Sequence, residues 1–273
     1  MGIAALASMS LGVLGRFLAR KRLRFPYLTG SLSAAEYSAL AAQPGWSKSR
    51  ITVAPGIGLN GLVRRPQAPG APWLLFYQGN DAEMLRVGQA FLSRVSEGRD
   101  WGLAIYAYRG YDSSDGEASL AAIAADAPMI LEQLCATEKV DRGRLHLIGF
   151  SIGGHFAVRA LGAAARLQSK PASLSLLASV DDIVMFRRSP FAKLDPGDDY
   201  QTRPFLETVP APVLVVQGTA DEALMGPGQG RAIAAKLGNR ARYLELPGLK
   251  HKELLENAQS VAAVIDFIAA QAK

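Results

Sequence analysis

Two hydrophobic patterns alternate along most of the chain. Short apolar runs, which suit buried strands, are followed by longer stretches with apolar residues three or four positions apart, which suit amphipathic helices. Such alternation is typical of a mostly parallel sheet with helices on both faces. Beyond Pro26 the sequence has neither repeats nor low-complexity linkers. We therefore expect one α/β domain over residues 26–273.

The pattern assigns eight strands and five helices. The strands are expected at 51–55, 57–65, 72–78, 101–108, 144–150, 173–178, 211–218 and 241–247, the first two as an antiparallel pair. The helices are expected at 33–43, 81–97, 118–136, 152–165 and 252–270. The prediction is thus a mostly parallel, eight-stranded α/β sheet.

The N-terminal segment, residues 1–25, differs from the rest of the chain. Its uncharged run MGIAALASMSLGVLG is followed at once by Arg16, Arg20, Lys21, Arg22 and Arg24. A secretory signal peptide has the opposite order, with its charges before the apolar run. The segment is interpreted either as a membrane anchor or as a helix packed on the domain. Residues 1–24 therefore make a membrane surface one expected partner, with the domain in the cytoplasm.

Composition narrows the classes of site and partner. The chain has 273 residues, 49% hydrophobic, and a formal net charge of +6. Its basic residues are spread along the chain and no groove-reading motif occurs, so we expect no nucleic-acid partner. The single cysteine, Cys135, rules out a disulfide framework, and no Cys/His cluster suggests a metal.

The segment GFSIGG, residues 149–154, places Ser151 among glycines directly after an expected buried strand. The pentapeptide Gly-x-Ser-x-Gly alone is weak evidence, because average composition gives about 0.1 to 0.2 chance occurrences in such a chain. In a nucleophile elbow the serine occupies a strained strand-to-helix turn, and the glycines avoid side-chain collisions there. This hypothesis requires a strand before Ser151, a helix after it, and then an acid and a histidine.

Three histidines are candidates for the base that a serine hydroxyl needs. His146 lies in the expected strand before Ser151 and His155 on the helix after it, so both are interpreted as packed or helix-surface residues. His251 lies in a loop between the last strand and the last helix. From there an imidazole can reach the carboxyl edge of the sheet, and His251 is therefore the predicted base.

Asp221, in VVQGTADE after the penultimate strand, is the predicted acid that orients His251. Its alternative role is a helix N-cap, which aspartate favours. Asp181 and Asp182, in ASVDDIV, compete for the catalytic role because they also follow a strand. Glu222 is a weaker substitute.

When a serine attacks a carbonyl group, the carbonyl oxygen becomes negatively charged, and backbone N–H groups would have to stabilise this oxyanion. Ile152 is one predicted donor, because it follows the nucleophile at a helix N-terminus. Asn80, in FYQGNDAE, is the second, with Gly79 expected to permit an unusual backbone turn. The alternative is that Gly79, Asn80 and Asp81 merely form a turn and cap the next helix.

Together these motifs resemble the α/β-hydrolase superfamily, in particular its small lipase, esterase and serine-aminopeptidase-like branch, over about residues 50–270. The matching segments are GFSIGG, QGN where relatives have HGN or HGG, YRGYDSSDGE, VQGTADE and His251. The resemblance implies the α/β-hydrolase fold, with Gly79, Arg109 and Tyr111 contacting substrate. Gln78, in place of the usual histidine, should alter hydrogen bonding under the oxyanion loop.

The resulting expectation is a serine hydrolase that cleaves a small-molecule ester or acyl substrate through an acyl-enzyme, with Ser151, Asp221 and His251 as its triad. It needs neither a cofactor nor a metal. A thioesterase, a peptidase or amidase with the same triad, and a non-catalytic binding protein of this fold are the alternatives. An insertion at about 181–210 is expected to form a short cap, which suggests small or medium acyl groups.

Overall fold

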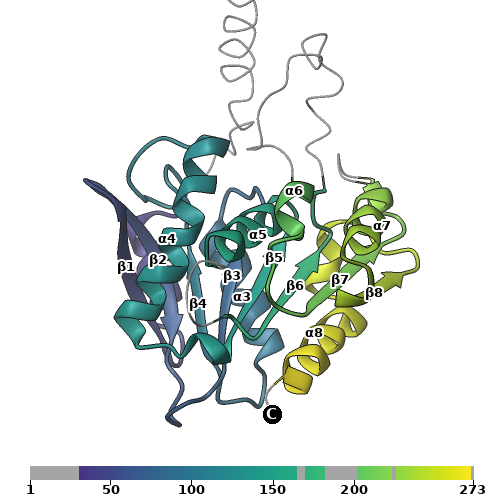
Figure 1. The fold of residues 1–273 in the computed structure, drawn as a ribbon. Coiled ribbons are helices and arrows are strands. Elements are labelled where there is room, and N and C mark those ends of the chain that lie inside the picture. The colour runs from purple at the N-terminus through teal and green to yellow at the C-terminus, as the bar shows by residue number, and fades with distance from the viewer. Residues whose placement is uncertain (1–30, 165–169, 182–201, 223–225, 272–273) are drawn as a thin grey trace, which may run out of the picture.

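A computed structural model describes residues 31–164, 170–181, 202–222 and 226–271 (Figure 1). Its sheet has eight strands in the order β1-β2-β4-β3-β5-β6-β7-β8. The strands are β1 Trp46–Ala54, β2 Ile57–Arg64, β3 Trp73–Tyr77, β4 Gly102–Tyr106, β5 Leu145–Phe150, β6 Ser173–Leu177, β7 Val213–Gly218 and β8 Ala241–Leu246. Strand β2 pairs antiparallel with β1 and β4, and the other neighbours pair parallel. The predicted mostly parallel, eight-stranded sheet is confirmed.

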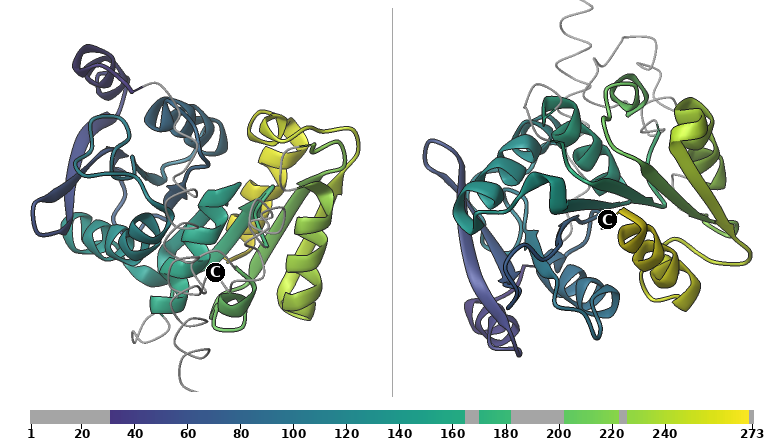
Figure 2. Two further views of the ribbon diagram at one scale, coloured as in Figure 1. Left: turned by 90° about the horizontal axis from the view of Figure 1, so that it is seen from above. Right: turned by 60° about the horizontal axis from the view of Figure 1, so that its bottom comes forward.

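Helices cover both faces of this sheet. They are α2 Ala34–Ala41, α3 Met84–Val95, α4 Leu120–Glu138, α5 Ile152–Ala164, α6 Arg203–Leu206, α7 Gly226–Leu237 and α8 Ala258–Gln271. Figure 2 shows α3 and α8 on one face and α4, α5 and α7 on the other. Every residue of β3 to β7 is buried, because parallel strands with helices on both sides have no solvent-facing side.

Helix α7 and the last helix differ from the prediction. Helix α7 was not expected, because its first turns read GPGQG and carry no apolar periodicity. The last helix is interrupted: a 3₁₀ turn at Lys252–Leu255 precedes α8. The Asn257 Oδ1 atom accepts the N–H groups of Gln259 (2.9 Å) and Ser260 (3.1 Å) and so caps the new helix.

Helix α4 is long and apolar enough to cross a membrane by length and composition. Half of its apolar window is buried, and the helix packs on α5 and β1. In this structure α4 is thus a covering helix of the sheet. The predicted anchor segment 1–25 and residues 182–201 of the predicted cap lie outside the described residues. The described end of the cap region contains the short helix α6.

Candidate active site

Ser151 occupies the sharp turn between β5 and α5. Its φ angle is +55°, in the left-handed region that non-glycine residues seldom adopt. The Ser151 N–H donates to the Leu177 carbonyl (2.9 Å), and the Ser151 carbonyl accepts the Gly154 N–H (3.1 Å). Such backbone strain costs about 1–3 kcal/mol and clusters at functional sites. The turn therefore has the geometry expected of a nucleophile elbow.

The glycines around Ser151 provide space rather than a special backbone conformation. A Cβ atom on Gly153 would lie 2.0 Å from the Tyr77 carbonyl oxygen, and one on Gly149 would lie 2.4 Å from the Gly154 Cα atom. Neither Gly149 nor Gly153 has a left-handed φ angle. The serine itself takes the strained conformation, and the glycines let α5 approach β3 and β5.

Segment 79–80 lies directly beside Ser151. A Cβ atom on Gly79 would lie 3.0 Å from the Ser151 Cβ atom. The φ angle of Gly79 is not in the left-handed region, so the close approach, and not the unusual turn expected from the sequence, explains this glycine. Ile152 is the first residue of α5, which places its N–H at the helix N-terminus. The two predicted oxyanion donors therefore belong to segments that flank the nucleophile.

Tyr111, Arg109 and Asp112 each join the loop with the sequence YRGYDSSDGE to a neighbouring segment. The Tyr111 hydroxyl donates to the Asn80 side-chain oxygen (2.8 Å). The Arg109 guanidinium donates two hydrogen bonds (2.6 and 2.5 Å) to Asp126, a buried residue of α4. The Asp112 carboxylate accepts backbone N–H groups of Leu32 and Leu85, and burial raises the pKa of this carboxyl. Tyr111 thus contacts the segment beside Ser151, whereas the Arg109 guanidinium is bound to α4.

Asp221 and His251 lie side by side at the carboxyl edge of the sheet. The His251 Nδ1 atom is 2.9 Å from the Asp221 Oδ2 atom, and the Asp221 side chain is fully buried. The ring centroids of His251 and Phe150 are 4.9 Å apart, which places the imidazole next to the residue that precedes Ser151. Because the carboxylate only accepts, the tautomer of a neutral imidazole that fits this contact has its proton on Nδ1 and a lone pair on Nε2.

The competing candidates have other partners. Asp181 is buried and forms an ion pair with Arg203. Asp182 lies outside the described residues. His146 is buried in β5, and its Nδ1 atom is 2.8 Å from the Ser173 hydroxyl. His155 is buried on α5 with its Nδ1 atom 3.1 Å from the Thr202 hydroxyl.

The structure also brings together residues that the sequence did not single out. The Gln217 side-chain amide donates to the Asp221 Oδ2 atom (3.0 Å). The Lys252 ammonium donates to the Asp81 carboxylate (2.6 Å) and so joins the loop of His251 to the loop of Asn80. Lys252 and Asp81 lie 171 positions apart in the sequence and meet only in the folded protein. Gln217 and Asp221 are four positions apart, but no motif marks a contact at that spacing between a strand and its following loop.

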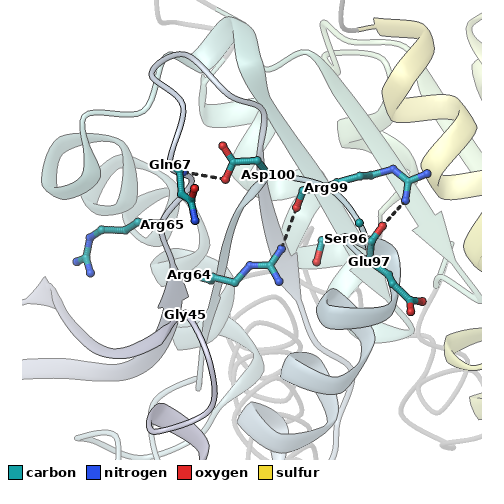
Figure 3. A pocket seen from close by; sticks show the side chains of 9 residues that line it. Gly45, Arg64, Arg65, Gln67, Ser96, Glu97, Arg99 and Asp100 are labelled. Carbon is teal, nitrogen blue, oxygen red and sulfur yellow. Dashed lines mark hydrogen bonds between the residues drawn. The ribbon is translucent and has the colours of Figure 1, made fainter.

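A depression of about 520 Å³ lies at the opposite end of the sheet (Figure 3). Its charged side chains have local partners. Arg64 donates to the Arg99 carbonyl (3.4 Å), Arg65 forms an ion pair with Glu138, and Asp100 accepts backbone N–H groups of the neighbouring loop. The depression contains no serine, acid and base set comparable to Ser151, Asp221 and His251. Among the described residues, no group of three or more His, Cys, Asp or Glu side chains could hold a metal ion.

Comparison of the sequence identifies relatives of this chain. No protein-family model matches the sequence. Uncharacterized proteins from two strains of Mycobacterium tuberculosis are 30% identical over 214 residues, covering 72% of this chain and 69% of each relative.

Solved structures of α/β hydrolases superpose on most of the chain. The alpha-beta hydrolase of Vibrio vulnificus has a TM-score of 0.72 at 17% identity, covering 94% of this chain and 93% of its own. An esterase of Pyrococcus furiosus has a TM-score of 0.65 at 13% identity, covering 90% and 95%. The enol-lactonase of Burkholderia xenovorans has a TM-score of 0.63 at 20% identity, covering 81% and 100%. At these identities the likeness shows the fold.

Proposed function

We propose that this chain, which has the fold of the α/β hydrolases, is a serine hydrolase that cleaves carboxylic esters through an acyl-enzyme. The observation that carries this proposal is the hydrogen bond of 2.9 Å between His251 and the buried Asp221, with the His251 ring beside Phe150. An imidazole held by a buried carboxylate, beside the residue that precedes a strained serine, fits the arrangement that activates a hydroxyl nucleophile.

Acylation and deacylation would use the same three side chains. The Ser151 Oγ atom attacks the ester carbonyl carbon while the His251 Nε2 atom takes the hydroxyl proton. The tetrahedral intermediate then collapses, and the imidazolium returns that proton to the departing alcohol. Asp221 stays ionised throughout and stabilises the imidazolium. Water attacks the acyl-enzyme by the same route and releases the carboxylic acid and free Ser151.

The developing oxyanion would be held by the backbone N–H groups of Asn80 and Ile152. The contact between Gly79 and Ser151 supports this assignment, because it brings segment 79–80 next to the reacting atom. The N-terminus of α5 adds a favourable dipole at Ile152. The Tyr111 hydroxyl, which binds the Asn80 side chain, would keep this segment in place.

Turnover of p-nitrophenyl butyrate by two aspartate variants tests the proposal. Asp221→Asn should lower kcat about ten-thousandfold, because the histidine then holds the wrong tautomer. Asp181→Asn is the matched control, since it also removes a buried carboxylate after a strand, and it should leave kcat unchanged. Equal kcat values for Asp221→Asn and the parent protein would overturn the assignment.

The substrate class is proposed from the short cap expected at 181–210. A short cap leaves room for small or medium acyl groups, so turnover of p-nitrophenyl esters should fall from butyrate to palmitate. A maximum at palmitate would contradict this part of the proposal. Parallel assays with a butyryl thioester and an aminoacyl amide show whether the protein cleaves the ester, the thioester or the amide fastest.

A further inference from the structure

Gln217 is a polar residue inside an otherwise apolar strand. It lies in β7, in the sequence VLVVQG, and it is fully buried. A buried amide is costly unless its donors and acceptors are bound. The hydrogen bonds of the Gln217 amide therefore indicate why this residue occupies a buried position.

The Gln217 amide is bound to the predicted catalytic acid. Its Nε2 atom donates to the Asp221 Oδ2 atom at 3.0 Å and has a longer contact of 3.3 Å with the Gly218 carbonyl. The Oδ2 atom is also the one that accepts from the His251 Nδ1 atom at 2.9 Å. One carboxylate oxygen thus receives two N–H groups, one from β7 and one from the base.

A neighbouring helix is shaped around this amide. Gly230 of α7 is buried against Gln217, and a Cβ atom there would lie 2.9 Å from the Gln217 Oε1 atom. Among the residues that the structure describes, Oε1 has no hydrogen-bond partner. An apolar side chain of similar length would avoid that unpaired oxygen, so what the amide adds at this position is its N–H group.

We propose that Gln217 is a positioning residue of the triad, which fixes the Asp221 carboxylate and stabilises its charge through the bond from Nε2 to Oδ2. The proposal rests on the serine hydrolase function. The donated N–H holds Oδ2 where Nδ1 meets it, which would keep the imidazole in the orientation that proton transfer from Ser151 requires. It also lowers the proton affinity of the carboxylate, because a hydrogen bond to the charged form favours that form.

The first test is Gln217→Met, which keeps the length of the side chain and removes the donor. We expect kcat to fall about tenfold with KM nearly unchanged, because the interaction acts in the chemical step. The acid limb of the profile of kcat/KM against pH should shift to a pH about 0.5 unit higher. Without the N–H donor the carboxylate is more basic, so the Asp221–His251 pair holds its proton more tightly.

Gln89→Met is the matched control for losing a buried amide. Gln89 lies on α3, is buried and donates to the Leu40 carbonyl at 2.9 Å, away from the triad. This variant should lose stability as Gln217→Met does while keeping the parent kcat and acid limb. If Gln217→Met also keeps both kinetic values, the residue only packs and the proposal is wrong.

Gln217→Glu supplies a second test with nearly the same shape. Two neighbouring carboxyl groups share one proton at low pH, and the introduced group can then donate to Asp221. As the pH rises, the shared proton is lost and the two carboxylates repel each other. Activity should therefore approach that of the parent protein at low pH and fall with increasing pH. A pH profile parallel to that of the parent protein would contradict the proposal.

A fluorophosphonate probe separates this proposal from the function on which it rests. It should label the parent protein and, more slowly, Gln217→Met. An unlabelled parent protein would remove the serine hydrolase function and this inference with it. A labelled parent protein whose Gln217→Met variant is labelled at the same rate would overturn the inference alone.

Discussion

At the scale of single residues, space decides the identity of the glycines at the candidate site. Gly153 faces the Tyr77 carbonyl, and Gly149 faces the backbone of α5. The backbone strain is borne by Ser151, with a φ angle of +55°. The motif GFSIGG thus encodes a close approach of three segments as well as a turn.

Gly153→Ala should disrupt this approach. Its Cβ atom would lie 2.0 Å from a carbonyl oxygen of β3, and a backbone atom cannot move aside as a side chain can. We expect the free energy of unfolding to fall by about 1–3 kcal/mol and esterase activity to be lost. Urea denaturation measures the first quantity. Gly228→Ala, where a Cβ atom meets nothing within 4 Å, should lose neither stability nor activity.

His146 should make the stability of the fold depend on pH. Burial lowers the pKa of this imidazole from 6.5 to about 4. Between these values the unfolded chain binds a proton that the folded protein does not, so stability falls as the pH decreases from 6.5 to 4. The loss is at most about 3 kcal/mol. Urea denaturation across this range should show that the unfolding free energy of His146→Gln changes less with pH than that of the parent protein. An equal change would show that another group is responsible.

At the scale of the elements, strands β3 to β7 were predictable because burial on both faces leaves them mostly apolar. Strands β3, β5 and β7 appear in the sequence as WLLFY, LHLIGF and VLVVQG. Helix α7 was not predicted, since GPGQG begins a helix that tertiary packing stabilises and periodicity does not reveal. The bond from Gln217 to Asp221 was not predicted either, because it depends on how the loop after β7 brings Asp221 back beside Gln217.

The loop of Arg109 is joined to α4 by a buried charge. Arg109→Met would leave Asp126, with a side chain only 4% exposed, without this cation. We expect a loss of about 3 kcal/mol in unfolding free energy. Arg231→Met, which breaks the more exposed pair with Glu245, should cost less than about 1 kcal/mol. Losses of equal size in urea denaturation would contradict the role assigned to burial.

At the scale of the whole molecule, the described residues form one sheet with the candidate triad at its carboxyl edge and the depression of Figure 3 at the other end. Residues 1–24 carry the apolar run and basic cluster that were interpreted as an anchor or a packed helix. A deletion of residues 1–24 separates these interpretations. An anchor predicts that the full chain partitions with membranes and the shortened chain does not, whereas a packed helix predicts the same partition for both.

Mass spectrometry after treatment with a fluorophosphonate shows whether Ser151 is an activated nucleophile. We expect one adduct, located on the peptide that contains Ser151, and none in Ser151→Ala. The adduct should form more slowly in Asp221→Asn, because the imidazole is no longer oriented to take the serine proton. An unmodified Ser151 in folded protein would mean that this serine is not an activated nucleophile and that its strained turn is a feature of the fold alone.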